Sequence, residues 1–278
     1  YDHGPMSNGR YHAGVVYVIF GPISNSTNSI SSRNGHDLRI SGSLRSEFIG
    51  QELDSSDIDG DGKPELIIGA PNSNRGSVDG QGLVYILEGR DTWPNSIDLL
   101  TDDCLKIFGP WPYDKAGSKL VSADIDGDGH DEVVIGSMIG DGFQRSVQQA
   151  GNVYIMDGGF LSSRMPNGSF MLRTESNVTI SGDMKKMMTG SSLSLGDITD
   201  DGYPDLFIGA SGWKDPYSGF ETGAVLIFIG DLYSDHLELN TSSIPLISGF
   251  SDQDMAGSSV STRDINGDGK VDVLIGAT

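Results

Sequence analysis

The sequence is poor in cysteine, in basic residues and in long apolar segments, and each shortage excludes a class of protein. Cys104 is the only cysteine, so no disulfide framework can form within the chain. Lysine and arginine total 18 against 39 aspartates and glutamates, a net charge of −21, which argues against nucleic acid and anionic membrane surfaces as partners. The longest apolar runs have six residues, whereas a membrane-spanning helix needs ~20. The sequence therefore predicts no membrane span.

A helical pattern is also missing. No stretch places apolar residues at a sustained helical spacing, and 39 glycines and 11 prolines divide the chain into short segments. Those segments are brief apolar runs of four to six residues with turn signals between them. We therefore expect an all-β fold.

One acidic motif recurs four times in register. The copies begin at Asp57, Asp124, Asp197 and Asp264, with spacings of 67, 73 and 67 residues. Each copy follows a glycine-containing run of mostly small residues and leads into an apolar triplet ending in glycine. A glycine-led apolar run and one last short apolar segment complete each repeat. Four short strands per repeat predict four-stranded antiparallel blades arranged radially in a β-propeller.

Counting strands divides the chain into half a blade, three whole blades and another half. The predicted limits are 1–46, 47–113, 114–186, 187–253 and 254–278 of a single propeller segment, 1–278. Seven blades of ~67 residues would need about 470 residues. The chain is therefore expected to be part of a larger, seven-bladed ring, and the alternative is that its two half-blades close a four-bladed ring.

The four acidic motifs predict calcium sites, which we name loop one (57–65), loop two (124–132), loop three (197–205) and loop four (264–272). Oxygen ligands at positions 1, 3, 5 and 9 can converge on one hard cation, a glycine at position 6 permits the turn, and position 7 can add its backbone carbonyl. An EF-hand is excluded because its position 12 is glutamate, whereas that position is isoleucine in all four copies. We expect up to four Ca²⁺ ions, with a weaker third site because Thr199 replaces a carboxylate, and with neutral Asn266 in loop four.

The predicted calcium ligands share these five positions in each loop. They are Asp57, Asp59, Asp61, Lys63 and Glu65; Asp124, Asp126, Asp128, His130 and Glu132; Asp197, Thr199, Asp201, Tyr203 and Asp205; and Asp264, Asn266, Asp268, Lys270 and Asp272. Lys63, His130, Tyr203 and Lys270 stand at position 7 and are expected to contribute carbonyl oxygens.

These loops, followed by Ile68-Gly-Ala-Pro71 and Ile208-Gly-Ala-Ser211, resemble FG-GAP repeats over nearly the whole chain. The resemblance implies the propeller fold of integrin α subunits and of the C-terminal part of glycosylphosphatidylinositol-specific phospholipase D, with calcium in the loop between the first and second strands. The phospholipase is the favoured comparison, because integrin α propellers generally carry several disulfides. The motif is specific for fold rather than for activity.

No catalytic constellation is visible. The five histidines form no zinc motif, and no nucleophile elbow, Walker A loop or dinucleotide fingerprint occurs. Sequons at Asn25, Asn167, Asn177 and Asn240 are candidate glycosylation sites in an extracellular protein.

The expected function is thus that of a noncatalytic, calcium-stabilised binding or scaffold segment of a secreted phospholipase-D-like protein. The alternatives are an integrin-type adhesion propeller or a generic extracellular FG-GAP module. A protein, glycan or glycolipid partner is expected on the face opposite the calcium loops, where loops 71–81, 137–150 and 211–222 differ in length.

Overall fold

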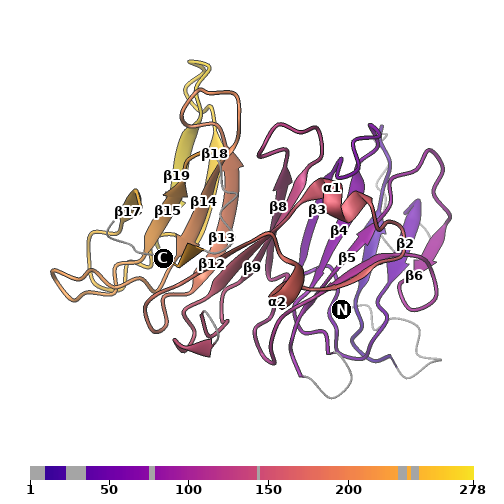
Figure 1. Ribbon diagram of the computed structural model, residues 1–278, viewed down its shortest axis with the longest axis horizontal. Coiled ribbons are helices and arrows are strands. Elements are labelled where there is room, and N and C mark those ends of the chain that lie inside the picture. The colour runs from indigo at the N-terminus through magenta and orange to yellow at the C-terminus, as the bar shows by residue number, and fades with distance from the viewer. Residues whose placement is uncertain (1–9, 23–35, 75–78, 143–144, 231–236, 239–243) are drawn as a thin grey trace.

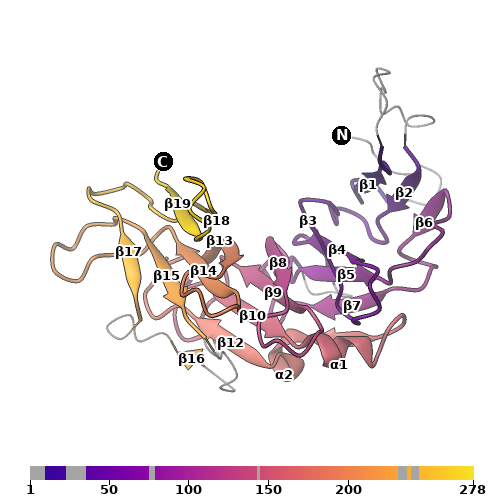
Figure 2. The same cartoon turned by 90° about the horizontal axis from the view of Figure 1, so that it is seen from above.

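The computed structural model describes residues 10–22, 36–74, 79–142, 145–230, 237–238 and 244–278. Its sheets stand side by side (Figure 1) and follow an arc when seen from above (Figure 2). The strands are β1 (Val15–Val18), β2 (Leu38–Ser41), β3 (Glu52–Ser56), β4 (Glu65–Ala70), β5 (Leu83–Leu87), β6 (Ser96–Asp98), β7 (Leu105–Phe108), β8 (Lys119–Ala123), β9 (Glu132–Ser137), β10 (Asn152–Met156), β11 (Ser169–Met171), β12 (Val178–Ser181), β13 (Thr189–Gly196), β14 (Asp205–Ala210), β15 (Ala224–Phe228), β16 (Leu237–Glu238), β17 (Leu246–Ser248), β18 (Ser259–Arg263) and β19 (Asp272–Gly276).

Three complete antiparallel blades form, as the repeat predicts. Their strand orders are β3-β4-β5-β7, β8-β9-β10-β12 and β13-β14-β15-β17. Before them lies the pair β1-β2, and after them the pair β18-β19. Figure 2 shows β3, β8, β13 and β18 toward the concave side of the arc and the last strand of each blade toward the convex side. The all-β, bladed fold class is therefore confirmed.

The register between second and third strands is the same in each complete blade. Gly69 pairs with Val84, Gly136 with Val153 and Gly209 with Val225. A side chain at Gly69 would collide with the carbonyl oxygen of Gly117, which belongs to the following blade. The glycine that ends each apolar triplet thus permits close approach between blades.

In the part of the chain that the structure describes, the hydrophobic core consists of three layers, each between two neighbouring sheets. Neighbouring residues on a strand serve different layers, because side chains alternate between the faces of a sheet. Ile68 and Tyr85 pack toward β1 and β2, whereas Ile67 and Ile86 pack toward the blade that contains β9 and β10. A third layer joins that blade to β14 and β15. This two-sided burial explains why the second and third strands are apolar throughout.

Two features differ from the sequence prediction. First, the long connections between third and fourth strands supply outer strands that pair in parallel with the preceding blade: β6 with β2, β11 with β7 and β16 with β12. Second, two short helices form where the sequence shows no convincing helical period: α1 (Gly158–Ser162) and α2 (Leu172–Glu175), which lie on the convex side of the arc (Figure 2). Both are too short to show a helical period.

The arc is open in this structure. Among the residues that the structure describes, neither β1 nor β2 pairs with β18 or β19, and the two pairs stand at opposite ends of the arc (Figure 2). The four-bladed ring, the alternative considered from the sequence, is therefore not formed. In the described ranges no helix is long and apolar enough to cross a membrane.

Candidate calcium loops

Loop one brings three predicted carboxylates together. Asp57, Asp59 and Asp61 each place an oxygen within 4.8 Å of the others. Backbone amides hold them in place, because the Gly62 amide donates to Asp57 at 2.9 Å, the Asp61 amide to Asp59 at 3.1 Å and the Lys63 amide to Asp61 at 2.8 Å. Gly62 has a φ of 86°, which a side chain rarely allows. The amide hydrogen bonds and the turn at Gly62 therefore direct the three carboxylates toward one point.

The donor set of loop one fits a calcium ion. The Oδ1 atom of Asp57 is buried and accepts no hydrogen bond, so it is available to a cation. A cluster of carboxylate oxygens is the type of donor that Ca²⁺ prefers. Lys63, expected to contribute its carbonyl, also pairs through its ammonium group with Asp61 at 3.3 Å. That contact is exposed and offsets part of the negative charge.

Loop two forms two overlapping carboxylate groups. Asp124, Asp126 and Glu132 make one, and Asp126, Asp128 and Asp157 make the other. Asp157 was not predicted, since it lies outside the motif, directly after β10. The signal that could have found it is position, because third strands end on the same face as the acidic loops. Asp157 also accepts a hydrogen bond from the Phe160 amide at 2.6 Å and so caps α1.

The ninth-position acids of loops one, two and three are buried at the base of their loops. Glu65 accepts from the Ile58 amide at 2.7 Å and from the Gly89 amide at 3.0 Å, so it ties its loop to the end of the third strand. Burial raises the pKa of Glu65 and brings that of Glu132 to about 7, although hydrogen bonds from amides oppose both shifts. In a neutral solution without a cation, Glu132 is therefore costly to ionise.

Loops three and four follow the same backbone course as loops one and two. Among the described residues, however, neither of them brings three carboxylates within 4.8 Å of one another. The Thr199 hydroxyl lies 3.4 Å from Asp197 and acts as its donor. In loop four, the Gly269 amide is the main cause that lowers the pKa of Asp264. The remaining predicted ligands are Asp201, Tyr203, Asp205, Asn266, Asp268, Lys270 and Asp272, and all except buried Asp205 and half-buried Asp272 are exposed.

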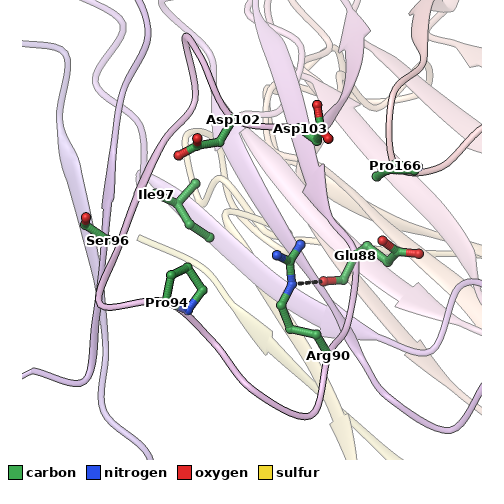
Figure 3. Close-up of a pocket in the computed structure, with 8 residues that line it drawn as sticks. All are labelled: Glu88, Arg90, Pro94, Ser96, Ile97, Asp102, Asp103 and Pro166. Carbon is green, nitrogen blue, oxygen red and sulfur yellow. Dashed lines mark hydrogen bonds between the residues drawn. The ribbon is translucent and has the colours of Figure 1, made fainter.

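A separate hollow lies beside the outer strand β6. It has a volume of about 520 Å³ and is lined by Glu88, Arg90, Pro94, Ser96, Ile97, Asp102, Asp103 and Pro166 (Figure 3). The side chain of Arg90 stacks on Trp93, with 4.9 Å to the ring centre, and donates to the Glu88 carbonyl at 3.2 Å. The hollow contains three acidic side chains, and the arginine that lines it already contacts Trp93 and the Glu88 carbonyl. It is therefore unsuitable for anionic ligands.

The opposite face, where a partner is expected, carries exposed aromatic side chains. Tyr113, Tyr217, Phe220 and Phe250 lie on connections at the ends of the strands remote from the calcium loops. Backbone bonds join these connections in pairs: the Tyr113 amide donates to Asp79 at 2.9 Å, and the Gln253 amide donates to Glu221 at 2.8 Å. The aromatic groups are thus presented from connected loops rather than from free ends.

The predicted glycosylation sites fall in different environments. Asn167 is exposed. Asn177 is half-buried, and its side-chain oxygen accepts from the Asp157 amide at 2.9 Å. Asn25 and Asn240 lie outside the described residues.

Comparison with known proteins agrees with this geometry. A family model described as FG-GAP repeat matches residues 50–87, 116–156, 189–228 and 256–278, just over half of the chain. Integrin alpha-5 of Xenopus laevis is 28% identical over 211 residues, covering 70% of this chain and 18% of that protein. Phosphatidylinositol-glycan-specific phospholipase D of Homo sapiens is 32% identical over 178 residues, covering 61% of this chain and 19% of that protein. The chain spans less than a fifth of either relative.

Proposed function

Because this chain belongs to the FG-GAP repeat family, we propose that it is a calcium-stabilised propeller segment that acts as a noncatalytic binding or scaffold module. The observation that carries the proposal is the convergence of carboxylates in loops one and two, together with the unpartnered Oδ1 atom of Asp57. Calcium would supply the positive charge that lets these carboxylates lie together. The chain's own part is to hold them with backbone amides.

The calcium is structural in this proposal. Loop one is bonded to the third strand of its blade through Glu65 and to the next blade through Asp131. Neutralising the repulsion within each loop therefore stabilises contacts between strands and between blades. At ten times the Kd, one bound ion contributes roughly 1.4 kcal/mol, and extracellular calcium modules have Kd values of ~0.1–1 mM. Loops that bind in this range would be filled where calcium is millimolar, so we propose an extracellular location.

A thermal melt tests this proposal. Removal of calcium with a chelator is expected to lower the Tm, and magnesium is expected to restore it poorly, because Mg²⁺ demands a tighter octahedral site. Asp61→Ala and Asp128→Ala should each lower the calcium-dependent part of the Tm more than Asp201→Ala, since loop three gathers fewer carboxylates. A Tm that does not respond to chelator would contradict the proposal.

The parent protein is proposed to be phospholipase-D-like, with an integrin-type adhesion propeller as the second candidate, since relatives of both kinds match. In either case the exposed aromatic groups Tyr217 and Phe250 support a protein, glycan or glycolipid partner on the face opposite the calcium loops. The purified chain, supplied with calcium and zinc, is expected not to release a glycosylphosphatidylinositol-anchored substrate. Metal-dependent release would overturn the noncatalytic proposal.

A further inference from the structure

We propose that loops one and two bind calcium cooperatively, and that Asp131 and His130 of loop two are the positioning residues that couple them. The proposal rests on the calcium function proposed above and adds a dependence of one site on the other. Neither side chain was among the expected ligand groups: Asp131 stands at position 8, and His130 at position 7 was expected to contribute only its carbonyl.

Asp131 holds the first ligand of loop one from both sides. Its Oδ2 atom accepts from the Asp57 amide at 3.1 Å and from the Ser56 hydroxyl. Its own amide donates to the Asp57 carbonyl at 3.1 Å. Asp57 is therefore fixed by a residue of the following blade rather than by its own loop alone.

His130 makes a second link in the same place. Its Nδ1 atom lies 3.2 Å from the Ile58 carbonyl oxygen and can donate to it. The backbones are also in close contact, because a Cβ atom at Gly60 would stand 2.8 Å from the Gly129 carbonyl oxygen. Glycine at this position lets the second half of loop two lie directly on the first half of loop one.

Residues 128–132 consequently serve both sites. They contain predicted ligands of loop two, namely Asp128, the His130 carbonyl and Glu132, and between these ligands lie the groups that contact loop one. An ion in loop two would fix the backbone of this segment and thereby place Asp57 for the next ion. Without it, repulsion between the loop two carboxylates loosens the segment. Coupling of this kind is reciprocal, so an ion in loop one must favour loop two equally.

The link is specific to this pair of loops. Position 8 is Pro64, Pro204 or Val271 in the other loops, and none of these has a side-chain acceptor. The ring of Tyr203 in loop three packs on Gly127 of loop two. Lys270 of loop four reaches Asp200 of loop three at 3.5 Å, but both side chains are exposed, and such pairs contribute little.

Calorimetric titration with CaCl₂ tests the coupling in the full chain carrying Asp201→Ala and Asp268→Ala, which disable loops three and four. We expect two ions to bind, the second with at least about fivefold higher affinity than the first. Adding Asp131→Ala should leave both ions binding but remove this difference. The matched control is Asp91→Ala, which removes an exposed carboxylate 3.8 Å from Lys63 in loop one and should leave the cooperativity unchanged.

The outcomes separate the two proposals. If no calcium binds, the calcium function fails and the coupling fails with it. If two ions bind independently in the chain that carries only Asp201→Ala and Asp268→Ala, the calcium function stands and the coupling is wrong. Cooperativity that survives Asp131→Ala also overturns the assignment. If circular dichroism shows that Asp131→Ala is unfolded, the milder variants Ser56→Ala and His130→Ala replace it in the titration. Each removes one contact between the loops and keeps every ligand atom. Both are expected to reduce the ratio of the second calcium affinity to the first.

Discussion

At the scale of single residues, two buried acids on the face opposite the calcium loops have different surroundings. They are Glu47 and Asp114, which stand at equivalent positions of successive repeats. Glu47 is completely buried and accepts from the amides of Ser43 and Leu44 at 2.8 and 2.9 Å, from the Ser73 hydroxyl at 3.1 Å, and from the Tyr85 hydroxyl. Its charge is satisfied by several donors, as a buried carboxylate requires.

Asp114 stands 67 positions later and lacks these donors. It is only 2% exposed, and its Oδ2 atom has no hydrogen-bond partner. Burial, followed by repulsion from Asp141, raises the pKa of Asp114 from 3.8 to about 7. Aspartate is one methylene shorter than glutamate, and this difference is consistent with its failure to reach equivalent partners.

Asp114→Asn is therefore expected to stabilise the protein at high pH. A carboxyl whose pKa is higher when folded contributes its full stability below the unfolded value, near 4, and loses it as the pH rises through about 7. Asparagine removes that loss, because it buries no charge. We expect a gain of ~1–3 kcal/mol at pH 8, a smaller gain at pH 5 and little change below pH 4, measured by urea unfolding in constant calcium.

The matched control for this prediction is Glu47→Gln. Its amide would present hydrogens to the hydroxyl groups that now donate to Glu47, so we expect a loss of ~1–3 kcal/mol at both pH values. A gain at pH 5 equal to that at pH 8 for Asp114→Asn would contradict the proposed role of ionisation.

Residue-level prediction from sequence succeeded where spacing carries the information. The acids at positions 1, 3 and 5 of loop one meet because alternate residues of a curled loop point inward. Asp157 and Asp131 could not be found in the same way. The first joins loop two from outside the motif, and the second acts on the loop of the preceding blade, so both contacts depend on how blades pack.

At the scale of elements, strands were predictable where apolar residues recur and unpredictable where long-range polar contacts decide. The central strands β4, β5, β9 and β10 match the apolar runs of the repeat. The outer strand β6 has three residues, of which only Ile97 is buried. Arg10, far away in sequence, contacts its last residue: it bonds to Asp98 at 2.6 and 2.7 Å and to the Gly42 carbonyl at 2.9 Å.

Asp98→Asn is expected to loosen β6 from β2. Arg10 is only 7% exposed, and loss of its ionised partner would leave a buried charge poorly compensated. Asp98 itself is about one-third exposed, so we expect a moderate cost of ~1–3 kcal/mol. Hydrogen exchange should quicken at the amides of Arg39 and Leu99, which bond across this junction at 3.1 Å.

Asp91→Asn serves as the control for that measurement, since the Asp91 contact with Lys63 is long and Asp91 is 84% exposed. It should change neither stability nor exchange measurably. Unchanged exchange at Arg39 and Leu99 in Asp98→Asn would show that backbone pairing alone holds β6.

At the scale of the whole molecule, the sequence predicted bladed sheets but left two arrangements of the ends open. The repeat fixes strand order and register within a blade, since these follow from local apolar patterns. Whether the half-blades meet depends on the angle between successive blades, which is set by packing in the three core layers and is not visible in a linear pattern. The structure has an open arc (Figure 2).

Among the strands that the structure describes, β1 and β19 each have one edge without a pairing strand. If the ring closed with the register of the complete blades, Leu274 would face Val18, as Ile67 faces Ile86 and Phe207 faces Ile227. We expect cysteines placed at Val18 and Leu274 to form no disulfide within a monomer, because these edges stand apart. Cross-linking between molecules should appear at high concentration, since exposed edges tend to pair.

The control for this cross-linking shares one of the two positions. Ser261 pairs with Leu274 between β18 and β19, so cysteines at Ser261 and Leu274 should form a disulfide within the monomer whenever the final half-blade is folded. The native Cys104 is buried and does not compete. Mass spectrometry of the gel-filtered monomer distinguishes the two designs. An efficient disulfide between positions 18 and 274 in that monomer would mean that in solution the half-blades close into the four-bladed ring.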